Sequence, residues 1–324
     1  MKLPARWIPQ LSTNTWLRIA AGLVVVFGFL VHEAEWYRYR AIQQMELWAY
    51  DTRLRLFMPN TLDPRVVILD IDEKSLNAEG RWPWSRNKLA LMVKQLFDRY
   101  DVKVVGFDVA FPESDPSSGL ASLEDMATKE LKDDPKFQET FAARKPSLDY
   151  DRIFAEEIGR HPVVLGFFLG DKRERSGVLP PPMFRAKEAF GDKIVRHIAA
   201  AGFSGNLQVL QNAASATGHL YPELDFDGVS RRVPMYVAYE EGYYEAMALA
   251  VTRIYLGNQP AKLYTQDLGN NILDVPSVQT GQLVVPLDDR MSALIPYRGP
   301  GGGAVYRYIS ATDVIRGTLP ADEL

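Results

Sequence analysis

The chain has 324 residues, of which 47% are hydrophobic and 24% charged, values typical of a protein with a packed core and not of a disordered or fibrous chain. Its 37 Lys and Arg residues against 41 Asp and Glu residues give a net charge of −4, which leaves no basic surplus for binding nucleic acid. It contains no Cys, so disulfide bonds, zinc–thiolate sites, iron–sulfur clusters and a thiol nucleophile are excluded.

An apolar segment near the N-terminus predicts the compartment. Residues 19–31 carry no charge, and their apolar flanks bring the segment close to the roughly twenty residues that a bilayer span requires. Basic residues precede the segment and acidic residues follow it, namely Lys2, Arg6 and Arg18, then Glu33 and Glu35. Because cytoplasmic flanks are enriched in Lys and Arg, this asymmetry predicts a cytoplasmic N-terminus.

We therefore predict a cytoplasmic segment over residues 1–15, a transmembrane anchor over residues 16–36 and an extracytoplasmic domain over residues 37–324. The protein would lie in the inner membrane with its main domain in the periplasm. Two alternatives are a cleaved signal peptide, which has a similar charged start and short apolar stretch, and a buried core helix. Residues 31–36 lack a small-x-small cleavage site, which favours an anchor that is retained.

Helical and strand-like patterns alternate along the rest of the chain. Helices are predicted over residues 38–57, 87–100, 151–160, 245–256 and 310–316. Strands are predicted over residues 66–71, 102–109, 162–168 and 233–239, with a late pair over residues 283–287 and 293–297. Residues 112–150 are rich in charge and proline and predict an exposed insertion with one or two helices. This order predicts an α/β fold with a mostly parallel sheet and helices on both faces.

The strands at 66–71 and 102–109, with a helix between them, predict a βαβ unit in which the two strands are adjacent and parallel. Their carboxyl ends would then meet at one edge, where open α/β sheets bind ligands. Acidic side chains gather there and need a nearby arginine or cation, so the candidate ligand-binding residues are Asp70, Asp72, Glu73, Arg81, Arg86, Asp108 and Glu113. Two hypotheses stay open: a sensor site for a small ligand or a cation of unknown identity, and a structural Arg–Asp network.

Asp70 and Asp72 also allow a second class of function. An Asp-x-Asp pair at the end of an apolar strand is where phosphatases of the haloacid dehalogenase type hold Mg²⁺ and attack phosphate. Asp288 and Asp289 would supply a second acidic pair. However, Lys74 stands where that motif has Thr or Val, so a membrane-tethered, Mg-dependent phosphatase is retained only as an alternative.

Several stretches occur in an order that points to one family. They are Asp51–Arg53 with Pro59, VVILDIDEKSLNAEGRWPWSR at 66–86, VKVVGFDVAFPESD at 102–115, FAEEIGRHPVVLGFF at 154–168, GHLYPELDFDGVSRRVPMYV at 218–237 and IPYRGPGGGAVYRYISATDVIRG at 295–317. Together they resemble the second type of CHASE domain, the "cyclases/histidine kinases associated sensory extracellular" family, over about residues 45–324.

The resemblance implies an extracytoplasmic sensor in a bacterial transmembrane receptor, with further transmembrane helices and a cytoplasmic output module following it. In that family the module is most often an adenylate or guanylate cyclase and otherwise a kinase, so catalysis is expected outside this chain and no cofactor within it. The family pattern continues past residue 324 with another strand, so the sheet is expected to be incomplete. A non-catalytic domain that binds an envelope protein stays open as an alternative.

The helix at 38–57 runs from the anchor into the domain, and we predict that it transmits the signal. Asp51 and Arg53 are the candidate coupling residues, and Trp48 and Leu54 on its apolar face are a candidate contact of a homodimer. The expected partners are therefore the membrane, a second copy of the chain, and an unidentified small ligand or cation.

Overall fold

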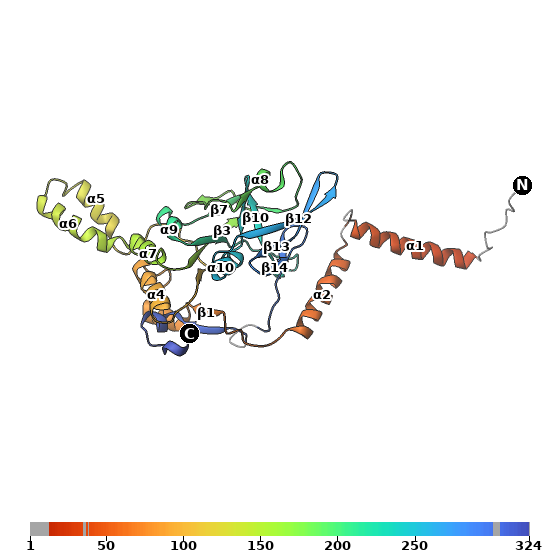
Figure 1. The fold of residues 1–324 in the computed structure, drawn as a ribbon, viewed down its shortest axis with the longest axis horizontal. Coiled ribbons are helices and arrows are strands. Elements are labelled where there is room, and N and C mark those ends of the chain that lie inside the picture. The colour runs from red at the N-terminus through yellow and green to blue at the C-terminus, as the bar shows by residue number, and fades with distance from the viewer. Residues whose placement is uncertain (1–12, 35–36, 38, 301–304, 324) are drawn as a thin grey trace, which may run out of the picture. The chain divides into compact units, whose positions relative to one another are not determined.

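The structure is a computed structural model that describes residues 13–34, 37, 39–300 and 305–323. The chain divides into two units, residues 1–61 with 296–301 and residues 62–295 with 302–324. Figure 1 shows the order of the elements along the chain. The predicted cytoplasmic segment lies outside the described residues except for its last three positions, as do Lys2, Arg6 and Glu35.

The first unit contains two helices, α1 (Thr13–Glu33) and α2 (Arg40–Phe57). Helix α1 has 21 residues with a mean hydropathy of 1.8, and in the described part of the chain it is the helix long and apolar enough to cross a membrane. It buries none of its own residues, so the core-helix alternative lacks the packing it requires. Helix α2 ends before Pro59, where the Met58 backbone N–H still donates to the Leu54 carbonyl at 2.8 Å.

The second unit contains the other elements. Its helices are α3 (Glu73–Glu79), α4 (Arg86–Asp98), α5 (Leu120–Thr128), α6 (Pro135–Leu148), α7 (Tyr150–Ile158), α8 (Ala186–Phe190), α9 (Gln208–Ala213), α10 (Met247–Tyr255), α11 (Ala311–Ile315) and the 3₁₀ turn Ala321–Glu323. Its strands are β1 (Val67–Asp70), β2 (Val105–Phe107), β3 (Val163–Gly170), β4 (Arg175–Ser176), β5 (Phe184–Arg185), β6 (Ile198–Ala199), β7 (Gly202–Ser204), β8 (Ala216–His219), β9 (Arg232–Pro234), β10 (Tyr236–Tyr239), β11 (Gly242–Glu245), β12 (Ala261–Gly269), β13 (Ile272–Thr280), β14 (Leu283–Pro286), β15 (Ser292–Leu294) and β16 (Arg307–Ser310).

The strands form several small sheets. Strand β3 is central to the largest one: its first half pairs in parallel with β2 on one side and β8 on the other, and its second half pairs antiparallel with β7, which pairs in parallel with β4. A second sheet has the order β5-β11-β10-β6, and β12-β13-β14 form an antiparallel sheet. Two further sheets are pairs, β1 with β16 and β9 with β15.

The α/β class is confirmed, but the expected mostly parallel sheet is wrong, because the sheets are small and mixed. Antiparallel hairpins such as β10–β11 and β12–β13 contribute much of the pairing. The predicted βαβ unit is wrong as well, since β1 pairs with β16 and β2 pairs with β3. The late pair is also wrong: β14 pairs with β13, and β15 with β9.

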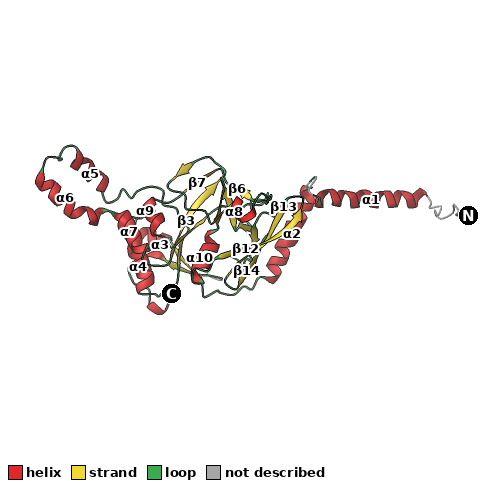
Figure 2. Ribbon diagram, turned by 45° about the horizontal axis from the view of Figure 1, so that its top comes forward, coloured by secondary structure: helices red, strands yellow, loops and turns green. Residues whose placement is uncertain are grey.

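The main hydrophobic core packs helices α4, α7 and α11 against residues of β2, β16 and the first half of β3. Leu89, Phe154 and Val314 from these helices are fully buried there, and Phe107 of β2 is 7% exposed. This core contains no residue of α5 or α6. Those two helices form an arm that Figure 2 shows standing away from the strands. They are the one or two helices expected within residues 112–150, and the assignment of that segment as an insertion stays a prediction.

Candidate functional site

The carboxyl end of β1 is occupied by a helix cap. Asp72 precedes α3, and its Oδ1 accepts the Ser75 backbone N–H at 2.8 Å, as an N-cap Asp does. The Ser310 hydroxyl at the end of β16 donates to Asp72 Oδ2, and this bond together with those from Ser75 holds the pKa of the Asp72 carboxyl below its usual range. Asp70 lies opposite Ser310 in the strand pairing, and Glu73 is exposed on the first turn of α3.

A second contact network ties α3 to α11. Although burial alone would raise the pKa of Glu79, hydrogen bonds from Lys88, Arg316 and Thr312 lower it to about 2. The Arg316 Nε–Glu79 Oε1 distance is 2.7 Å and the Lys88 Nζ–Glu79 Oε2 distance is 2.9 Å. The Thr312 backbone N–H donates to the hydroxyl of Ser75, which is completely buried. The Arg316–Glu79 and Thr312–Ser75 contacts each join residues 237 positions apart and make this end of β1 a structural junction.

The acidic residues that follow β2 do not belong to that junction, because β2 pairs with β3 and not with β1. Asp108 follows β2 and is open to solvent, although desolvation by neighbouring protein atoms raises the pKa of its carboxyl. Glu113 is exposed, and its backbone carbonyl accepts from Arg86 Nη2 at 3.5 Å. Because β1 and β2 belong to different sheets, the shared edge that would gather all the candidate acids is absent. A ligand-binding role for these residues stays a prediction.

Arg86 has acidic partners, but they lie at the base of the α5–α6 arm. Its backbone N–H donates to Asp115 Oδ2 at 2.5 Å, its Nε lies 3.6 Å from Asp151 Oδ1, and its guanidinium lies 4.3 Å from the centre of the Phe111 ring. Asp151 in turn accepts the Asp115 backbone N–H at 2.9 Å. Burial lowers the pKa of Arg86 and raises that of Asp151. Arg81, the other candidate arginine, is exposed.

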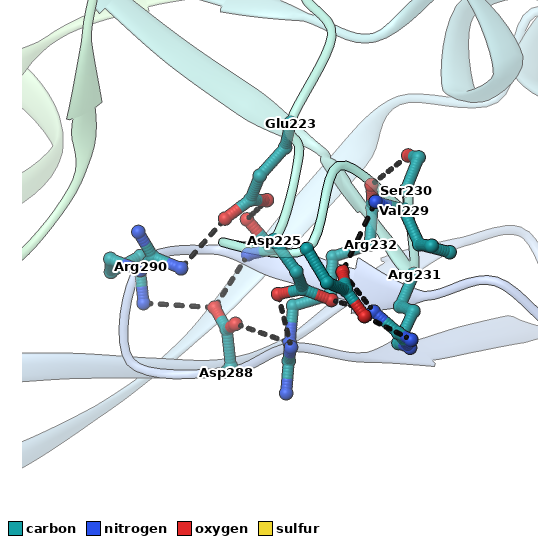
Figure 3. Close-up of polar contacts among 10 residues, drawn as sticks. Glu223, Asp225, Val229, Ser230, Arg231, Arg232, Asp288 and Arg290 are labelled. Atoms are coloured by element: carbon teal, nitrogen blue, oxygen red, sulfur yellow. Dashed lines mark hydrogen bonds and ion pairs between the residues drawn. The ribbon is translucent and has the colours of Figure 1, made fainter. Parts of the chain in front are cut away.

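The Asp-Gly-Val-Ser-Arg-Arg stretch forms a tightly paired turn before β9. The Arg231 side chain is 4% exposed and donates to Asp225 at 2.9 Å and to Asp227 at 2.8 Å (Figure 3). Arg231 also lowers the pKa of the Asp227 carboxyl. Gly228 has a φ of 80°, which favours glycine at that position of the turn. The segment forms a β-turn, in which the Gly228 backbone N–H donates to the Asp225 carbonyl at 2.9 Å.

The same turn is linked to the segment between β14 and β15. Arg232 Nε lies 3.2 Å from Asp288 Oδ2, and Arg290 Nη2 lies 2.7 Å from Glu223 Oε1 (Figure 3). The Ser292 hydroxyl donates to Glu223 Oε2 at 2.8 Å. Asp288 is therefore engaged by arginine, which is the arrangement of a structural ion-pair network.

Metal binding finds no support in this geometry. Across the described ranges, no group of three or more His, Asp or Glu side chains is placed to hold a metal ion. A phosphatase of the type considered above needs such a group around Asp70 and Asp72. The partners of Asp72 are instead Ser75 and Ser310.

A cavity beside α9 has a polar wall that was not predicted from the sequence. This wall is built by Gln208, Gln211 and Asn212. Their i, i+3, i+4 spacing places three amides on one helix face and is the signal that points to them. The helix itself has six residues and lacks a strong apolar period, so it was not predicted.

A model of the CHASE2 domain matches residues 21–324. The chain belongs to the CHASE2 family. No curated protein and no solved structure matches the chain. CHASE2 domains are sensory domains, typically extracytoplasmic in bacterial receptors, and α1 at the N-terminal end of this CHASE2 chain is consistent with membrane anchoring.

Proposed function

We propose that this chain is the sensory region of a bacterial transmembrane receptor, anchored in the inner membrane by α1 and placed in the periplasm. The observation that supports it is the CHASE2 match over residues 21–324, which begins inside the one apolar helix of membrane-spanning length in the described chain. The output module is a nucleotide cyclase outside residues 1–324, because domains of this family most often accompany adenylate or guanylate cyclases.

The receptor works as a homodimer whose signal passes through α2. Support comes from the surface of that helix: α2 buries no residue, and Trp48, Leu56 and Phe57 are 68%, 73% and 81% exposed. Exposed aromatic and aliphatic side chains of this size favour contact with another surface. Asp51 and Arg53 lie on the same helix and are the proposed coupling residues.

The first test is topology. Alkaline phosphatase, which is active only in the periplasm, is fused after residue 324 or, as a matched control, after residue 12. Activity in the first fusion alone, with the full-mass protein retained in the washed membrane fraction, is expected. An active enzyme released in a shortened form would show a cleaved signal, and activity in neither fusion would contradict the periplasmic location.

The second test is output. The full-length receptor is expressed in a bacterial strain without its own cyclases, and cyclic AMP and cyclic GMP are measured against the empty vector. A rise in either nucleotide is expected, and Asp51→Ala or Arg53→Ala should change it without altering the amount of receptor in the membrane. No rise in either nucleotide would contradict a cyclase output, and unchanged nucleotide levels in both variants would contradict the coupling role.

A further inference from the structure

A cavity of about 340 Å³ lies in the second unit of the chain. Four parts of the chain line it: Phe167 of β3, the proline-rich connector at residues 178–183, helix α9 with the start of β8, and the β11–α10 region. Its volume falls within the range of roughly 300–1,000 Å³ that small-molecule sites occupy. The cavity is separate from the ion-pair networks described above, and nothing in the proposed function uses it.

Helix α9 contributes three amide side chains to the cavity lining. Gln208 Nε2 donates to Asn212 Oδ1 at 2.7 Å, and both residues lie on the same face of α9. Gln211 Nε2 lies 3.4 Å from the Thr217 hydroxyl, and Gln211 Oε1 is buried without a hydrogen-bond partner among the described residues. Amides both donate and accept hydrogen bonds, so this wall suits a ligand that carries both kinds of group.

The charge of the cavity is balanced within the protein. Glu245 and Arg253 are the charged residues of its lining, and they form a two-point ion pair with Arg253 Nη2 2.8 Å from Glu245 Oε1 and Arg253 Nε 3.2 Å from Glu245 Oε2. Glu245 is 3% exposed, so its charge is met inside the protein. A charged ligand would enter a site with no free counter-charge and lose hydration without compensation.

Other lining residues of the cavity are apolar or aromatic. They include Leu179, Pro180 and Pro181 of the connector, together with Phe167 and Tyr244. Phe167 is 1% exposed and Tyr244 is 6% exposed, so their positions are set by packing. A ligand that fits must therefore present hydroxyl or amide groups to α9 and carbon–hydrogen surface to the connector.

We propose that this cavity binds a small neutral polyhydroxyl compound of about monosaccharide size. Sugars combine hydroxyl groups, which donate and accept, with apolar faces that pack against rings. A purely apolar ligand would leave the amides of α9 without partners, which disfavours it. The assignment deepens the proposed sensory function and rests on it for its role in signalling, but binding itself is measurable without any output module.

The test is a thermal-unfolding series on the detergent-solubilised chain with three matched probes: glucose, glucosamine and glucuronate, which are neutral, cationic and anionic pyranoses. Galactose and N-acetylglucosamine extend the neutral set. At least one neutral sugar is expected to raise the unfolding temperature by about 2 °C or more near saturation, and the two charged probes are expected to raise it less. Titration calorimetry then gives the dissociation constant.

Variants locate the binding. Gln208 and Asn212 are exposed at the mouth of the cavity, so the double variant Gln208→Ala/Asn212→Ala should fold normally and weaken binding of the sugar about tenfold. Gln266→Ala, at an exposed amide of β12 away from the cavity lining, is the control and should bind as the unaltered chain does.

Three results would overturn the proposal: no shift with any of the neutral sugars, tighter binding of glucosamine or glucuronate than of glucose, or sugar binding that the double variant leaves intact. Failure of binding with a normal cyclic-nucleotide output would reject the ligand class alone. Binding without any output would instead count against the proposed receptor function.

Discussion

His219 at the end of β8 is 2% exposed, and its Nδ1 accepts the Tyr221 backbone N–H at 3.3 Å. The other ring nitrogen, Nε2, must then carry the hydrogen, and it has no partner among the described residues. Burial lowers the pKa of His219 from 6.5 to about 3. The folded protein therefore holds the His219 ring in its neutral form, and protonation of the ring destabilises the fold.

The pH dependence of stability follows from this shift. Because the folded pKa is depressed, the unfolded chain takes up the proton first, and the stabilisation present above pH 6.5 is lost progressively as the pH falls toward 3. We expect the free energy of unfolding to fall by about 2 kcal/mol more in the unaltered chain than in His219→Gln between pH 6.5 and about pH 5. Denaturant titrations at each pH measure it.

The control is His197→Gln, which removes an exposed histidine that contacts Val195 and Tyr243. This variant also lacks one imidazole, so it shows how much of the change in pH dependence comes from removing any histidine. Parallel pH profiles for the unaltered chain and His219→Gln would show that His219 does not carry the effect.

The roles of residues that interact with close neighbours in the sequence were predictable. Asp72 accepts a hydrogen bond from the backbone of Ser75, three positions later, and the turn at Asp227–Gly228 is closed by a hydrogen bond between Asp225 and Gly228. Asp72 also binds Ser310 of β16, which lies 238 positions away in the sequence. No local sequence pattern predicts that contact. For the same reason the acids after β1 and β2 were expected to share an edge, whereas the strand pairing puts them in different sheets.

At the scale of elements, the presence of most helices and strands could be predicted from the sequence, whereas the pairing of the strands could not. The helices at α2, α4, α7, α10 and α11 follow from apolar periodicity, since each except α2 buries one face. Strand partners are chosen by tertiary packing, so β1 could not be assigned to β16 from sequence. The β12–β13 hairpin was missed because β12 is mostly exposed and lacks a clean alternation, although Asn270 and Asn271, with φ of 49° and 65°, are residues typical of its turn.

The α5–α6 arm is an element that the core does not need. Its helices bury no residue, and its own contacts, such as the Lys145–Glu124 ion pair at 2.8 Å, lie within the arm. Replacing residues 118–147 with a short Gly-Ser linker is expected to change the free energy of unfolding by less than about 1 kcal/mol, because loop closure depends weakly on length. Chemical denaturation followed by circular dichroism measures this.

Arg86→Ala supplies the contrast at the base of the arm. It leaves the largely desolvated carboxyl of Asp151 without its cation, and we expect the free energy of unfolding to fall by about 3 kcal/mol. If the arm deletion proved as costly as Arg86→Ala, the arm would have to contribute to the stability of the body, and the assignment of it as an independent element would be wrong.

On the scale of the whole molecule, the second unit is closed by its last elements. Strand β16 supplies the hydrogen-bonding partner of β1, and α11 contributes Ala311, Val314 and Ile315 to the core at exposures of 0%, 0% and 7%. Burying two side chains of the Val and Ile size stabilises by roughly 3–6 kcal/mol, a large part of the 5–15 kcal/mol that holds a domain folded.

We therefore expect a chain that ends after Tyr306 to lose cooperative thermal unfolding, because it lacks both β16 and α11. A chain that ends after Pro320 keeps Leu319, whose carbonyl accepts from the Tyr100 hydroxyl at 3.0 Å, and should unfold as the full chain does. Differential scanning calorimetry compares the two. Cooperative unfolding of the shorter chain at the normal temperature would contradict the closing role of these elements.

The parallel pairing of β1 with β16 also has a mechanical consequence. Four residue pairs, from Val67 opposite Arg307 to Asp70 opposite Ser310, are held side by side with both strands running the same way. Tension applied to the chain before β1 and after α11 pulls the two strands in opposite directions along their length. The load then falls on all the hydrogen bonds of the pair in shear, at the same time, instead of opening them one after another from an end. The domain can thus bear force between its two ends without first coming apart at this pair.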